Sequence, residues 1–148
     1  MLLTNRDHSV ELRPLRYQFP AVSGDWYDDN WLDVQGEITT PEGSWSFIDP
    51  CLLVDEAHAV STWLRTAATA APAPDLSFIE PVLSFGRSDR HDDGTLAVTI
   101  HFSHEAAPPW LHRDDRLDPY PVQFTLTAAA LCQAADTWDR HLARFPTR

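Results

Sequence analysis

Acidic and aromatic side chains are concentrated in one short stretch of this 148-residue chain, residues 25–38, which reads DWYDDNWLDVQGEI. Carboxylates at this density can bind a metal ion, supply catalytic acids or attract a cationic partner. An EF-hand calcium loop needs acids at its positions 1, 3 and 5, a glycine at 6 and a glutamate at 12. The aspartates of this stretch do not follow that spacing, so the sequence gives a metal site no support.

Patterns typical of catalytic sites are absent elsewhere in the chain. There is no G-x-S-x-G, no P-loop and no G-x-G-x-x-G, and the ligand spacing of zinc sites is missing. His101 and His104 fall on opposite faces of an expected strand and cannot share a metal there. Glu80 lies between Ile79 and Pro81 in a strongly apolar stretch, where a buried carboxyl could act as a general acid or base. We therefore expect no catalytic residue, cofactor or metal, and keep an enzyme using Glu80 as an alternative.

The overall charge favours a basic protein partner. The chain has 22 acidic residues against 11 basic ones, all arginine, for a net charge of -11. That balance argues against binding to nucleic acid, which requires cations, and against an anionic membrane surface. Exposed Trp and Tyr dominate binding energy, and surrounding acids steer basic partners. The predicted partner-binding residues are Asp25, Trp26, Tyr27, Asp28, Asp29, Trp31, Asp33, Glu37 and Trp110. The competing interpretation is a solubilising loop with some core aromatics.

Hydrophobic periodicity predicts the elements that must position these side chains. Alternation predicts strands over 10–19, 30–38 and 44–48, with a bulge at Pro14 on an edge strand. Within 49–71 apolar residues recur at helical spacing, and the proline-rich stretch 71–75 follows as a linker. Three further strands are expected at 76–86, 95–102 and 121–126. A final helix covers 128–145, with Thr127 as its N-cap.

The order is therefore βββαβββα, and the short connections favour antiparallel pairing. We expect a single α+β domain over residues 1–148, with one antiparallel sheet of about six strands and two helices packed on one face. The uncovered face would carry Asp33, Gln35, Glu37, Thr99 and His101.

Cellular location is also indicated by the sequence. Cys51 and Cys132 are far apart and without metal spacing, which is typical of two reduced, buried thiols in an intracellular protein. The first residues lack the apolar run of a signal peptide, and no stretch approaches the ~18 apolar residues of a membrane span. We expect a cytoplasmic protein.

Several segments, in order, resemble a known family. They are DDNWLDVQGEI, GSWSFIDPCLL, FIEPVLSF, PPW and a terminal amphipathic helix with RFP. Together they resemble the WapI-type immunity proteins over about residues 10–146. The resemblance implies an antitoxin that directly binds the C-terminal toxin domain of a WapA-type polymorphic toxin, often a nuclease acting on tRNA. No catalytic residue is carried over from the family.

Three hypotheses follow from the sequence. The first is an immunity protein that caps a basic toxin with its acidic, aromatic surface. The second is a small enzyme that uses Glu80 with an acid from residues 25–38, which requires a deep pocket joining them. The third is an acidic ligand-binding or scaffold module. A homodimer through the exposed sheet face is compatible with the first and third.

Overall fold

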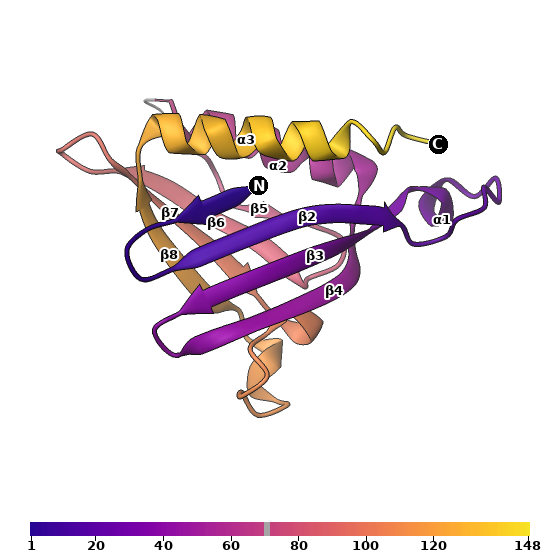
Figure 1. The fold of residues 1–148 in the computed structure, drawn as a ribbon, viewed down its shortest axis with the longest axis horizontal. Coiled ribbons are helices and arrows are strands. Elements are labelled where there is room, and N and C mark those ends of the chain that lie inside the picture. The colour runs from indigo at the N-terminus through magenta and orange to yellow at the C-terminus, as the bar shows by residue number, and fades with distance from the viewer. Residues whose placement is uncertain (70–71) are drawn as a thin grey trace.

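The fold is given by a computed structural model that describes residues 1–69 and 72–148. It consists of two four-stranded antiparallel sheets, with the two long helices along one margin (Figure 1). The N-terminal sheet has the order β1-β2-β3-β4 and contains β1 (Leu2–Thr4), β2 (Ser9–Tyr17), β3 (Trp31–Thr40) and β4 (Gly43–Leu53). The C-terminal sheet has the order β5-β6-β7-β8 and contains β5 (Leu76–Ser77), β6 (Leu83–Arg90), β7 (Leu96–Phe102) and β8 (Tyr120–Leu126). The helices are α1 (Trp26–Asn30), α2 (Val54–Ala67) and α3 (Ala128–Leu142), with 3-10 turns η1 (His104–Ala106) and η2 (Asp115–Leu117).

The α+β class and the antiparallel pairing predicted from the sequence are confirmed, but the strands form two sheets instead of one sheet of six. The alternation of apolar and polar residues along a strand shows which of its faces is buried. It does not show which other strands pair with it. The helix α2 separates the two groups of strands along the chain. Each group forms its own sheet. The short strand β1 was not predicted, and the single strand predicted over 76–86 is divided into β5 and β6.

The two sheets share one hydrophobic core. The ring of Phe102 on β7 lies edge-on to Trp45 and Phe47 on β4, with centroids 5.8 and 6.1 Å apart. The ring of Phe47 also covers Gly36, where a Cβ atom would approach the Phe47 Cε1 to 2.1 Å. A glycine in the middle of β3 is thus explained by the close approach of an aromatic ring.

The helices α2 and α3 pack against each other, and α3 also contacts β1 and β2 (Figure 1). The indole of Trp138 on α3 donates to the carbonyl of Ala57 on α2 at 2.7 Å. Thr127 caps α3 by accepting from the amide of Ala130, as predicted. Trp45, Trp63 and Trp138 are all buried, as their positions in the periodic pattern indicated. None of the described helices is long and apolar enough to span a membrane.

Some local expectations are corrected by the structure and others are confirmed. The expected strand over 76–86 is interrupted between β5 and β6, so Glu80 lies exposed in a turn instead of buried in a strand. Cys51 is buried as expected, but Cys132 is exposed. The bulge at Pro14 is present; β2 has a neighbour on each side, but β1 pairs only with residues 9–11, so Pro14 itself lies on a free edge. Of the predicted linker 71–75, residue 71 lies outside the described residues.

Candidate partner-binding groove

The segment 18–30 projects from one end of the molecule and carries the helix α1 (Figure 1). Asp25 is the N-cap, and its carboxylate accepts from the amides of Tyr27 at 2.9 Å and Asp28 at 3.1 Å. An aspartate suits this position because the first amides of a helix have no partner within the helix. One turn of helix therefore presents Trp26 and Tyr27 to solvent, with 43% and 56% of their surfaces exposed.

The buried carboxylate of Asp29 stabilises the segment by accepting hydrogen bonds from it. Its carboxylate accepts from the amide of Ser23 at 2.6 Å, the amide of Gly24 at 2.9 Å and the hydroxyl of Ser23 at 3.1 Å. The hydrogen bond from the Ser23 amide is the largest cause of a lowered pKa for Asp29; burial opposes this shift, and the other two hydrogen bonds add to it. Only 3% of the Asp29 surface is exposed. We therefore remove Asp29 from the predicted contact surface and assign it to loop structure.

Residues at the other end of the chain hold the base of the segment. Asn30 and Arg148 exchange two hydrogen bonds, at 2.9 and 3.2 Å. The Arg148 guanidinium donates to the carbonyl of Phe19 at 3.2 Å and lies 3.4 Å from the centroid of the Tyr17 ring. Tyr17 donates in turn to the carbonyl of Pro146. Several contacts therefore hold the base of the segment, while Trp26 and Tyr27 at its tip remain exposed to solvent.

The remaining predicted residues lie in separate places. Asp33 is 7% exposed and pairs with the Arg16 guanidinium at 2.7 Å, so its charge is already balanced. Glu37 lies on the outer face of the N-terminal sheet. Trp110 packs edge-on against Trp45 at 5.4 Å, in the loop between β7 and β8. The sequence therefore named residues that the fold distributes over three surfaces.

Asp28 and Trp31 line a groove, and acidic residues from three distant segments line it with them. The groove has a volume of about 460 Å³, is open to solvent, and is lined by Gln18, Phe19, Asp28, Trp31, Asp49, Pro50, Glu80, Val82 and Glu105. Within the described part of the chain, neither an arginine nor a histidine lines it, and none of its four carboxylates forms an ion pair. We call this the acidic groove.

The position of Asp49 follows from the alternation of β4. Counting on from Trp45 and Phe47, the side chain of Asp49 points to the inner side of the sheet. The register of β3 and β4 shifts directly after it, between Asp49 and Leu52, where β4 forms a bulge before it ends at Leu53. The inward carboxylate beside this bulge is half-buried and lines the groove.

Glu80 and Glu105 are brought to the groove by two connected turns. The Glu56 carboxylate on α2 accepts from the amide of Ile79 at 2.8 Å, which fixes the turn before Glu80. The amide of Ser103 donates to the carbonyl of Val82 at 3.0 Å, which ties that turn to the end of β7. His104 then takes a positive φ of 53°, an uncommon backbone conformation for a non-glycine residue, and the chain turns into η1 with Glu105.

The carboxylates of the groove repel one another. Burial raises the pKa of Asp49 to about 6, and the negative charges of Glu105, Glu80 and Asp33 act in the same direction. His104 acts against this shift, as the smallest of the causes. Among the described residues no three His, Cys, Asp or Glu side chains lie close enough to hold a metal ion. The arrangement therefore suits several separate positive groups on a partner surface better than one chelated cation.

Some of the residues that line this groove were predicted from the sequence, and others were not. Asp28 and Trp31 were predicted, and Glu80 was named only for the alternative enzyme. Asp49, Glu105 and Phe19 were not named. The inward parity of Asp49, counted from Trp45, was a usable signal, since a carboxylate rarely faces a core without reason. Nothing in the sequence placed Glu105 beside it, because that proximity depends on the packing of the two sheets.

The fold and the groove together define an α+β protein with an open polyanionic groove, a class of site suited to a large cationic surface. The chain belongs to the WapI-like immunity protein family, whose family model matches residues 1–146. The resemblance found in the sequence is thereby confirmed over nearly the whole chain. No curated protein matches the chain. Membership of this family implies binding to a cognate toxin.

Proposed function

We propose that this protein protects its cell by binding a cognate toxin domain with the acidic groove and the Trp26–Tyr27 tip. The observation that carries the proposal is the group of four carboxylates in one open groove, whose described lining residues include no arginine. Unbalanced charges of one sign are costly for a protein to keep together unless a partner balances them. The adjacent exposed aromatic pair supplies the apolar contact area that dominates binding energy.

The expected target is the C-terminal domain of a WapA-type toxin, with a basic active site. A nuclease needs cationic side chains to hold phosphate. Carboxylates spaced along a groove can meet those cations in place of phosphates. Binding of this kind blocks the active site by occupation, requires no turnover by this protein, and takes place in the cytoplasm, where the toxin acts.

A second candidate function is supported by one observation. The groove unites Glu80 with Asp28, the pairing that a small acid–base enzyme would need. Against it, Glu80 is exposed and the groove is open, whereas catalytic carboxylates work in enclosed sites that separate their pKa values. Glu80→Gln separates the two functions, because an enzyme would lose its activity outright while a multi-contact binder would keep most of its affinity.

Co-expression with the toxin tests the proposed function. The C-terminal toxin domain encoded beside this gene is produced in bacteria with and without this protein, and growth is recorded. We expect this protein to restore growth against that domain and to give no protection against an unrelated toxin domain. Failure to restore growth while both proteins accumulate in soluble form would overturn the proposal.

A further inference from the structure

The strand β4 forms an open border of the N-terminal sheet. The order β1-β2-β3-β4 places β3 on one side of β4 and no strand on the other (Figure 1). β4 pairs with β3 through a two-residue turn that joins Thr40 to Gly43. In a hairpin of this kind the residues that flank the turn exchange hydrogen bonds, and every second residue after them does so too. The amides and carbonyls of Ser44, Ser46 and Ile48 therefore point away from β3.

These outward groups have no backbone partner in the part of the chain that the structure describes. The backbone hydrogen bonds outside the ladders include none to Ser44, Ser46 or Ile48. The three side chains are exposed, with 56% of the Ile48 surface open. Native edge strands are usually blocked by charged side chains, prolines or bulges. Here the bulge and Pro50 come only after Ile48, so a stretch of about 14 Å at 3.4 Å per residue remains open.

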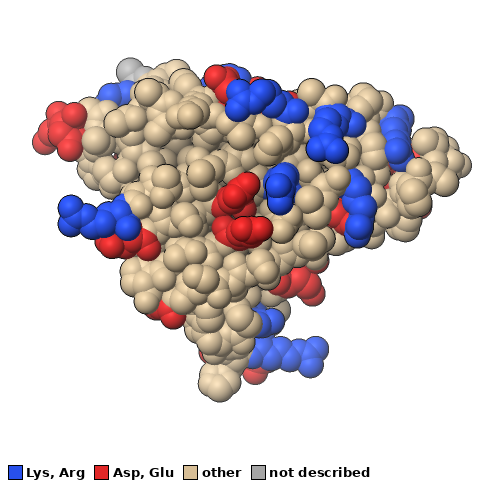
Figure 2. Space-filling view, viewed as in Figure 1, with Lys and Arg blue, Asp and Glu red and all other residues tan. Residues whose placement is uncertain are grey.

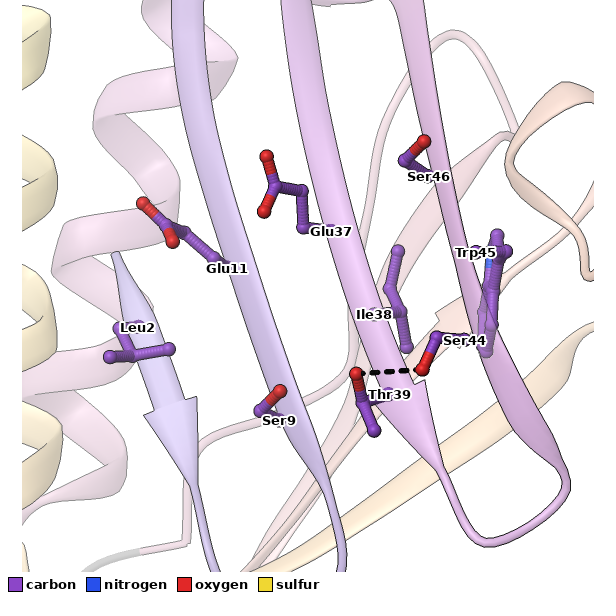
Figure 3. A pocket seen from close by; sticks show the side chains of 9 residues that line it. All are labelled: Leu2, Ser9, Glu11, Glu37, Ile38, Thr39, Ser44, Trp45 and Ser46. Carbon is purple, nitrogen blue, oxygen red and sulfur yellow. Dashed lines mark hydrogen bonds between the residues drawn. The ribbon is translucent and has the colours of Figure 1, made fainter.

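Two glutamates lie in a row beside this edge, on the outer face of the sheet. Glu11 on β2 lies directly opposite Glu37 on β3, and Glu37 lies directly opposite Ser46. Like charges directly opposite each other destabilise a sheet. Glu37 accepts one hydrogen bond, from Gln35 at 3.0 Å, and neither glutamate forms an ion pair among the described residues. The two glutamates and the serines of β4 line one shallow hollow on the outer face (Figure 3).

The size of the side chains determines what fits next to β4. A residue that paired with Ser46 on an added strand would place its side chain on the same face as Glu37, roughly 10 Å away across two strand spacings. Ser44 and Ser46 are short, so a lysine or arginine at that position could extend over the serine to the Glu37 carboxylate. A glutamate there would add a third negative charge to the row.

We propose that the free edge of β4, from Ser44 to Ile48, pairs with an extended cationic segment of the toxin. This inference rests on the proposed function and adds a second contact of a different kind, made through main-chain hydrogen bonds. Ile48 is followed by Asp49, so a segment that pairs along the edge ends at the mouth of the acidic groove. A second copy of this chain fits the edge less well, because each copy carries a net charge of -11.

Amide exchange measured by NMR tests the pairing directly. The ¹⁵N-labelled protein is studied alone and in complex with the toxin domain encoded beside its gene. We expect the amides of Ser44, Ser46 and Ile48 to exchange at least tenfold more slowly in the complex. The amides of Trp45 and Phe47 already bond to β3 and serve as internal controls.

A matched pair of variants gives a second measurement. Ser46→Pro removes an outward donor and obstructs an added strand, and Ser46→Ala keeps the amide. We expect at least a tenfold loss of affinity for Ser46→Pro and less than twofold for Ser46→Ala. If Ser46→Pro does not fold, amide exchange in the unaltered protein decides alone.

The outcomes separate this inference from the proposed function. A complex in which residues of the acidic groove are perturbed while the edge amides exchange freely would overturn the pairing and leave the proposed function intact. Absence of any complex would overturn both. Slow exchange of the edge amides in the protein alone, together with a dimer in analytical ultracentrifugation, would show that a second copy takes the edge and would also overturn the pairing.

Discussion

The acidic groove and the outer face of the N-terminal sheet differ in how closely acidic side chains lie to arginines. On the outer face, acids and arginines occur near one another in small groups (Figure 2), and Asp33 is paired with Arg16. In the groove, four carboxylates line one hollow, and no arginine is among its described lining residues. A net charge of -11 therefore does not describe either surface. What matters for binding is where acids are left without a positive neighbour, which depends on the fold.

The exposed tryptophans also differ in what surrounds them. Trp26 and Trp110 are equally exposed, at 43% each. The ring of Trp110 packs edge-on against the buried Trp45 and lies close to Gly43, so part of Trp110 extends the hydrophobic core. Trp26 contacts Tyr27 at the tip of a projecting helix, and this pair is free to enter a partner's surface. Equal exposure thus conceals different surroundings.

The largest expected effect comes from removing the charge of the groove. In the triple variant Asp28→Asn, Glu80→Gln, Glu105→Gln, we expect toxin affinity to fall about 100-fold at low salt, mainly through slower association, because steering by a charged cleft raises association rates by roughly 10- to 1000-fold. Surface plasmon resonance at several salt concentrations measures this.

The control for that variant removes the same number of charges elsewhere. Asp92, Asp114 and Asp118 are exposed in loops outside the groove. Replacing all three with asparagine should change affinity less than threefold. Equal losses in both triple variants would mean that total charge, not the groove, governs binding.

The next effect is that of the aromatic tip. Trp26→Ala should weaken toxin binding by about 2 kcal/mol, or roughly 30-fold, as is typical of a buried interface tryptophan. Its thermal stability should change little, since the ring contacts mainly Tyr27. Trp110→Ala should show the opposite behaviour, with nearly unchanged affinity and a loss of about 1 kcal/mol of stability from the broken aromatic pair. Calorimetric binding and melting curves of the two variants test this contrast.

The smallest effect is a dependence on pH that originates at Asp49. Its pKa is raised to about 6 in the free protein, so between pH 4 and 6 the folded protein holds a proton that the unfolded chain releases, and stability falls as pH rises through that range. A cationic partner lowers this pKa again, so binding releases a proton and tightens as pH rises from 5 to 7. We expect a three- to tenfold gain, measured by titration calorimetry in buffers of different ionisation enthalpy. Asp49→Asn should abolish the proton release attributable to this residue; unchanged release in that variant would assign it to another group.

Much of the secondary structure could be predicted from the sequence, because alternation and helical spacing are local properties. The antiparallel pairing, the cap at Thr127 and the bulge at Pro14 were predicted for that reason. The division into two sheets was not predicted, because apolar faces do not identify their neighbours. The groove depends on that division, since Asp49 lies on β4 of the N-terminal sheet and Glu105 follows β7 of the C-terminal sheet.

The proposed function requires the acidic groove to receive cationic side chains of a toxin domain. A crystal structure of the complex tests it most directly. We expect lysine or arginine nitrogens of the toxin within 4 Å of the carboxylates of Asp49, Glu80 and Glu105, with Trp26 buried in the interface. A complex in which the groove remains filled with solvent and Trp26 remains exposed, while the toxin covers another face, would contradict it.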